Sequence, residues 1–145
     1  MDNYSKALEV YLKTPYEVIQ FPVAPQEFTV NFPSLNKTIN VLNFGEVPIL
    51  GANALRTWNI SSFFPLQEYS FCQCKPKDPN WYCYMIDNLK YHKTPCRIIV
   101  PSTILNNSCS IEEFNWSIKD GTRDVYFSIS FKEHKVVGQK RVVVI

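Results

Sequence analysis

Two histidines, His92 and His134, are the first residues to test for acid–base or nucleophilic chemistry, because an imidazole exchanges protons near neutral pH. His92 follows a predicted helix, and His134 lies in a charged stretch after a predicted strand. Neither stands beside a serine or cysteine in a known nucleophile motif. Both are therefore interpreted as solvated surface side chains.

Paired acids are the next candidates, because glycoside hydrolysis uses two carboxylates. Glu112 adjoins Glu113, and Asp120 precedes Asp124 across a predicted turn. Acids at such positions more often solubilise the chain or form the turn, and no other residue marks a sugar cleft. No glycine-rich phosphate-binding motif is present. We predict no catalytic residue, and an enzyme is the third-ranked hypothesis.

Five cysteines form an odd set that favours free thiols over a disulfide framework. Cys72 and Cys74, with Cys83 and His92, are the one combination that could be considered for zinc. A single C-x-C pair without a second pair matches structural zinc sites poorly. We predict no metal and no cofactor. The remaining two cysteines are Cys96 and Cys109.

The composition is that of one globular domain. The chain has 145 residues, of which 46% are hydrophobic, 14% aromatic and 19% charged. A net charge of +2 is too small to predict specific nucleic-acid or membrane binding. No apolar stretch is long enough to span a bilayer, and the first residues lack a signal-peptide pattern. Assembly in a bacterial cytoplasm is therefore expected.

Period-two patterns dominate the chain and predict strands at 17–23, 27–32, 37–44, 56–64, 97–100, 110–118 and 123–133. The last two of these segments form a predicted hairpin around Asp120-Gly121. A short amphipathic helix is expected over 5–13. A second helix is predicted near 78–91, with Asp78 as N-cap and Pro79 at the first helical position.

These elements predict a mainly β (α+β) domain. It contains about eight antiparallel strands, in a tail-tube-like β-sandwich or barrel, with one inserted helix. Residues 1–15 are expected to form an N-terminal extension, and 16–145 the β domain.

Two further segments suggest binding surfaces. Trp81, Tyr82 and Tyr84 lie close together and could stack on a sugar. With Tyr91, Lys90 and Lys93 they could also bind single-stranded nucleic acid, although packing of about half of these aromatic side chains between the helix and the sheet is the preferred interpretation. The β-branched run 142–145 must pair either with its own sheet or with the edge of a neighbour's sheet.

The order of several short motifs resembles PBSX-type (XkdP-like) phage tail proteins over about residues 16–133. The similarity is carried by Ser61-Ser62-Phe63-Phe64-Pro65, Tyr69, Phe71 and Cys72; by Pro79, Tyr82 and Ile86; by Pro95, Arg97, Ile98 and Ile99; by Ile111 and Phe114; and by Asp120, Gly121, Asp124, Val125, Phe127 and Ile129. Upstream, Pro25, Glu27, Phe28 and Gly45-Glu46-Val47 also agree.

The resemblance implies a structural baseplate component of a contractile phage tail or a phage-tail-like bacteriocin. Such a subunit forms a ring, typically a hexamer, that joins the tail tube to the hub and spike, with a tape-measure protein as a candidate occupant of the lumen. The implied partners are copies of itself, the tail tube protein and the hub/spike proteins. The implied location is the virion or tail-like particle.

Interface residues are expected among side chains that the predicted core does not require. The candidates are Phe63, Phe64, Tyr69, Phe71, Lys75, Lys77, Asp78, Val142, Val143, Val144 and Ile145. Many members of the family continue into a LysM module, and this sequence stops where that module would begin. The alternative function is a carbohydrate- or cell-wall-binding module of a tail particle.

Overall fold

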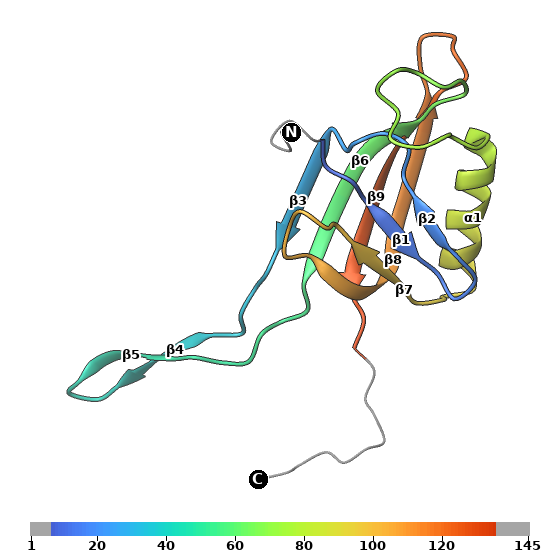
Figure 1. Ribbon diagram of the computed structural model, residues 1–145. Coiled ribbons are helices and arrows are strands. Elements are labelled where there is room, and N and C mark those ends of the chain that lie inside the picture. Colours follow the sequence, from blue (N-terminus) through green and yellow to red (C-terminus); the bar gives the residue numbers. More distant parts are fainter. Residues whose placement is uncertain (1–6, 136–145) are drawn as a thin grey trace.

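The computed structural model describes residues 7–135, and this part of the chain folds into nine strands and one helix (Figure 1). The elements are β1 (Tyr11–Lys13), β2 (Val18–Gln20), β3 (Glu27–Asn31), β4 (Lys37–Val41), β5 (Gly45–Ile49), β6 (Thr57–Phe64), α1 (Pro79–Tyr91), β7 (Cys96–Ile99), β8 (Asn106–Ile118) and β9 (Val125–Glu133). The predicted mainly β class with one inserted helix is confirmed.

Seven strands form a single antiparallel sheet in the order β2-β1-β7-β8-β9-β6-β3. Alternation explains its two faces. In β9, Phe127, Ile129 and Phe131 are buried, whereas Ser128 and Ser130 between them are partly exposed. The predicted hairpin between β8 and β9 is confirmed, and its register pairs Ile118 with Val125.

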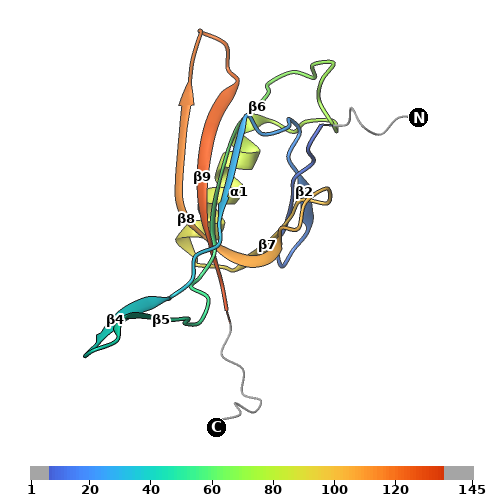
Figure 2. The ribbon, with the colours of Figure 1, turned by 90° about the vertical axis from the view of Figure 1, so that its left-hand side faces the viewer.

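The sheet curls so that its two halves face each other across one core (Figure 2). Long β8 pairs with both β7 and β9 and carries a register shift between Ile111 and Glu113. Such an irregularity increases the local bend of a strand. Leu12 on one half and Ile60 on the other are both fully buried in the shared core. Edge strands β2 and β3 are not paired with each other, so the described sheet is an open sandwich and not a closed barrel.

Helix α1 covers one opening of the curled sheet (Figure 1). The Asp78 carboxylate accepts a hydrogen bond from the backbone N of Asn80 at 2.8 Å, as expected of an N-cap. Tyr82, Ile86 and Leu89 recur at helical spacing and are buried. The predicted helix near 78–91 is thus confirmed. Among the described residues, no helix combines the length and apolar character that crossing a membrane requires.

The start of the described chain differs from the expected helix over 5–13. Tyr11–Lys13 is a strand between β2 and β7, and residues 7–10 are not helical. Val10 and Leu12 are almost completely buried, so this segment belongs to the sheet and its core and is not an extension. The apolar positions Leu8, Val10 and Leu12 also fit a period of two, and pairing on both sides of β1 selects the strand.

Candidate functional site

A hairpin arm, defined here as residues 33–55, leaves the sheet after β3 and returns to it at β6. It carries β4 and β5, which pair with each other and with no other strand of the described chain. Both ribbon views show the arm extending away from the sheet and from α1 (Figures 1 and 2). A two-stranded hairpin alone is marginally stable in water, so such an arm is expected to need a partner surface.

Two glycines permit the geometry of the arm. At its tip, Val41 pairs with Gly45, whose φ of 99° suits glycine, and the φ of Asn43 is 67°. At its base, a Cβ on Gly51 would lie 1.8 Å from the backbone oxygen of Leu35. Leu35 N donates to the Ala52 oxygen at 2.7 Å, so the two backbone segments of the arm approach too closely at this point for a residue larger than glycine.

One face of the arm is apolar and uncovered. Ile39 pairs with Val47 and lies on the same face as Val41 and Ile49, while Thr38, Asn40, Glu46 and Pro48 occupy the other face. Every residue of β4 is exposed. At the tip and base, Leu42 is 88% exposed, Phe44 76% and Leu50 82%. Clustered exposed apolar side chains of this kind mark interaction sites.

Sequence reasoning missed the arm as a candidate interface. It predicted a strand over 37–44 and no strand between 45 and 55, whereas Gly45–Ile49 is strand β5. Proline is tolerated in an edge strand, where one side of the backbone needs no partner. The signal that could have revealed the arm was the apolar alternation on both sides of a turn containing Asn43 and Gly45.

An apolar groove lies at the edge of the sheet opposite α1. It is lined by Phe28, Val30 and Phe32 from the β3 side and by Thr103, Ile104 and Leu105 from the connection before β8, and its volume is about 300 Å³. Ile104 is 83% exposed. Within the described residues, β3 pairs with β6 alone, so its other edge presents unpaired backbone groups beside this groove.

Three of the predicted interface residues meet on the polar face of the sheet. The rings of Phe63, Tyr69 and Phe71 lie with their centroids 5.1–6.3 Å apart. Phe63 also stacks on Tyr126 at 5.2 Å. Buried Asp124 positions this cluster, because its carboxylate accepts hydrogen bonds from Leu66 N at 2.8 Å and from the Tyr69 hydroxyl at 2.7 Å. Phe71 remains 55% exposed, so the cluster has a free side.

Phe64, also predicted as an interface candidate, is fully buried. Its ring stacks on Phe127 at 4.1 Å and on Tyr82 at 4.4 Å. Successive side chains of a strand point to opposite faces, so Phe63 and Phe64 cannot both meet a partner. In the described fold Phe64 is a core residue, and its assignment to an interface was wrong.

The predicted polar turn is exposed. Lys75 and Lys77 extend into solvent, and the Lys77 ammonium lies 4.1 Å from the centre of the Trp81 ring. Asp78 caps α1, which is a structural role sufficient to explain this residue. The remaining candidates, Val142, Val143, Val144 and Ile145, lie outside the described residues.

The aromatic platform considered for sugar binding does not form. Tyr82 is buried against Phe64, whereas Tyr84 is 70% exposed. Trp81 meets Tyr82 edge to face, with an interplanar angle of 85°. Their separation into core and surface follows from helical spacing, which points successive side chains in different directions.

The candidate catalytic groups are divided between several parts of the described fold, and two of them, Glu112 and His134, line one pocket together with Lys90 and Lys93. His92 caps the C-terminus of α1, with its backbone N donating to Asn88, and His134 follows β9. Asp120 lies in an exposed turn, whereas Asp124 is buried and hydrogen-bonded. Among residues 7–135, no group of three or more His, Cys, Asp or Glu side chains could hold a metal ion.

The geometry defines a class of structure: an open, curled antiparallel sheet with one covering helix and one projecting hairpin arm. Two solved structures have a similar fold. One is a chain from the virion of a native gene transfer agent particle, with a TM-score of 0.57 and 10% identity over 93% of this chain and 96% of that chain. The other is from the tail of an empty gene transfer agent particle with C6 symmetry, with a TM-score of 0.57, 13% identity and the same coverage.

Among curated proteins, this chain is similar to the uncharacterized protein YqbP of Bacillus subtilis (strain 168). The two are 23% identical over 138 residues, which is 92% of this chain. The match spans 62% of the length of YqbP. No family model matches the chain.

Proposed function

We propose that this protein is a non-catalytic structural subunit of a tail-type particle, and that it assembles with copies of itself into a ring. The observation that carries the proposal is the hairpin arm, because its apolar face is uncovered by any other described part of the chain. The similarity of fold to a chain from a tail with C6 symmetry favours a ring of six subunits.

The arm and the apolar groove beside β3 suit a heterologous contact, in which two different surfaces of the same subunit meet. Contacts of that type close into a ring when a whole number of equal rotations between neighbouring subunits completes a full turn. The arm would contribute Leu42 and Phe44, and the receiving subunit would contribute an edge strand and an apolar groove. Burial of these side chains would supply the hydrophobic part of the association free energy.

The polar face of the sheet suits the wall of a channel. Along β6, β9 and β8 this face carries hydroxyl and amide side chains with few charges, namely Asn59, Ser61, Ser128, Ser130, Asn115 and Ser117. Ser130 and Asn59 hydrogen-bond across β6 and β9 at 2.7 Å. A neutral, hydrated wall would let a polymer such as a tape-measure protein pass without strong binding.

Within the particle, we assign the ring to the baseplate, between the tail tube protein and the hub or spike. This finer location rests on the resemblance of the motif order to PBSX-type tail proteins. Under this assignment the protein acts by assembly in a contractile tail or a tail-like bacteriocin, and it needs neither a cofactor nor a membrane partner.

The test compares assembly of an arm variant with that of a matched control. Leu42→Ser with Phe44→Ser removes two apolar side chains that are 88% and 76% exposed. The control, Tyr16→Ser with Tyr91→Ser, removes two aromatic side chains outside the arm that are 84% and 77% exposed. We expect the arm variant to stay monomeric by mass photometry with tube and hub proteins, while the control assembles like the unaltered chain.

Cryo-electron microscopy of the intact particle then tests the location. A six-fold ring of this chain at the junction of tube and baseplate is the expected result. Absence of the chain from the finished particle would refute the baseplate assignment. Equal assembly of the arm variant and the control would refute the role of the arm.

A further inference from the structure

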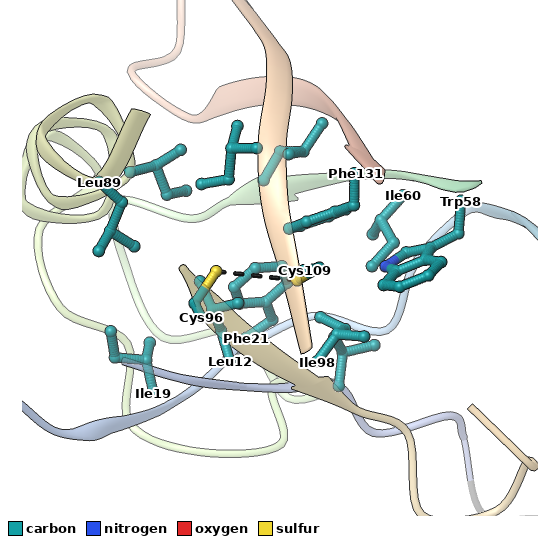
Figure 3. Close-up of a cluster of buried hydrophobic side chains, with 14 of the residues drawn as sticks. Leu12, Ile19, Phe21, Trp58, Ile60, Leu89, Cys96, Ile98, Cys109 and Phe131 are labelled. Atoms are coloured by element: carbon teal, nitrogen blue, oxygen red, sulfur yellow. Dashed lines mark hydrogen bonds between the residues drawn. The ribbon is translucent and has the colours of Figure 1, made fainter. Parts of the chain in front are cut away.

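Cys96 and Cys109 face each other in the core at the position where the two halves of the sheet join. They are directly opposite in the antiparallel register of β7 and β8, and their Sγ atoms are 3.8 Å apart (Figure 3). Cys109 also pairs with Glu133 of β9, so its backbone belongs to both halves of the curled sheet. A disulfide here would fix the two halves of the sheet relative to each other at the position where the sheet curls.

The surroundings hold the two thiols together and away from other reaction partners. Cys96 is 5% exposed and Cys109 is fully buried. Figure 3 shows them among Leu12, Ile19 and Leu89, in the same core cluster. Cα atoms of directly opposed antiparallel residues are separated by about 4.5–5.5 Å, which lies within the range that a disulfide spans.

We propose that Cys96 and Cys109 are a redox pair that closes into a disulfide across β7 and β8 when the folded protein meets a small peroxide. The inference is independent of the proposed assembly, because the pair lies within one subunit. The other three cysteines, which lie in the 65–78 segment and on α1, are not part of this pair.

The chemistry balances with hydrogen peroxide as the oxidant. The Cys96 thiolate attacks one peroxide oxygen, the O–O bond breaks, and Cys96 becomes a sulfenic acid as hydroxide leaves. The Cys109 sulfur then attacks the Cys96 sulfur, forming the S–S bond and displacing the sulfenic oxygen, which leaves as water with the Cys109 proton. The hydroxide combines with the proton that Cys96 lost, so two thiols and one peroxide give one disulfide and two waters.

Access to solvent supports the order of attack, because Cys96 is 5% exposed and Cys109 is fully buried, so a peroxide reaches Cys96 first. The hydrogen bond between the two sulfur atoms acts in the same direction, because it lowers the pKa of the Cys96 thiol. The Cys96 partner and burial raise the pKa of Cys109, so Cys109 stays protonated as the resolving thiol. A small peroxide suits the site, because a bulky oxidant would have to displace core side chains to reach a sulfur that is 5% exposed.

The experiment treats the reduced, folded full chain with hydrogen peroxide, quenches it, and blocks free thiols after denaturation. Trypsin then cleaves after Lys93, Arg97 and Lys119, so that Cys96 and Cys109 fall on separate peptides, 94–97 and 98–119. We expect these peptides to be joined, with the loss of two hydrogens, and to separate again on reduction. The disulfide closes a short loop and should raise the Tm by roughly 5–10 °C.

A triple variant, Cys72→Ser with Cys74→Ser and Cys83→Ser, is the matched control, because it leaves only the proposed pair. It should form the same linked peptides and show the same rise in Tm. Cys109→Ser should form no link between the two peptides. Its Cys96 should then be found either oxidised without a disulfide partner or carrying the thiol-blocking group. The proposal is overturned if both peptides carry the blocking group after peroxide treatment, or if disulfides form only among Cys72, Cys74 and Cys83.

Discussion

The guanidinium carbon of Arg56 lies 4.1 Å from the centre of the Phe32 ring, which joins the two ends of the hairpin arm at the sheet. Phe32 directly follows β3, and Arg56 directly precedes β6. Arg56 also donates through its guanidinium to Asn107 Oδ1 at 3.2 Å, and its backbone N donates to Glu133 Oε1 at 3.0 Å. The root of the arm is therefore tied to β8 and to the end of β9.

Replacing Arg56 should loosen the arm without unfolding the sheet. Arg56→Ala removes the cation–π contact and one hydrogen bond, and we expect it to lower the free energy of unfolding by about 1 kcal/mol. Hydrogen exchange over residues 33–55 should accelerate more than exchange in β9. Arg56→Lys keeps the charge over the ring and should have a smaller effect. Unchanged exchange in the arm of Arg56→Ala would contradict a role for this contact.

Replacing Asp124 should detach the segment that carries the aromatic cluster. Asp124→Ala removes the acceptor for Leu66 N and for the Tyr69 hydroxyl, and we expect a loss of about 2–3 kcal/mol in chemical denaturation. Asp87→Ala is the control, because Asp87 is exposed on α1 and its replacement should cost far less. Because the chain contains eight tyrosines and three tryptophans, fluorescence cannot report on Tyr69 alone. Hydrogen exchange of the Leu66 amide is therefore the better local measurement. Equal stability of the two variants would contradict the anchoring role.

Replacing Gly51 should distort the base of the arm through steric overlap alone. The Cβ of Gly51→Ala would meet the Leu35 oxygen at 1.8 Å, so the pairing of Leu35 with Ala52 must open. Gly45→Ala is informative as a comparison, because its Cβ would meet nothing within 4 Å and only its φ of 99° is unfavourable. We expect Gly51→Ala to reduce ring assembly more than Gly45→Ala does. The Tm of the seven-stranded sheet should change little in either variant. A larger loss in Gly45→Ala would show that the tip matters more.

Burial of Cys83 should make stability depend on alkaline pH. Burial raises the pKa of the Cys83 thiol from 9.0 to about 11. Between these values the unfolded chain loses the proton and the folded chain keeps it, so the stabilisation present below pH 9 is lost as pH rises towards 11. Cys83→Ser should decline less over this window in denaturant titrations. Parallel curves for the two proteins would contradict the assignment.

Local patterns were sufficient for most elements of the sheet and for α1. The alternation of Val125, Phe127, Ile129 and Phe131 predicted β9, because a strand with one buried face must repeat every second residue. Asp78 and Pro79 predicted the start of α1, since capping depends on neighbouring residues only. The segment around Leu8, Val10 and Leu12 was misassigned, because a short apolar pattern fits two periods and only pairing with β2 and β7 selects one.

For this protein, the sequence by itself determined the mainly β class, helix α1 and the β8–β9 hairpin, because each depends on contacts between residues close in the chain. The tertiary structure alone decided which aromatic side chains are available. It buries Phe64 and Tyr82 against each other and leaves Phe63 beside Tyr126 on the polar face. It also decided that the arm stands clear of the core and that Cys96 meets Cys109. The physical reason is that strand order and the curl of a sheet arise from long-range pairing, which no local pattern encodes.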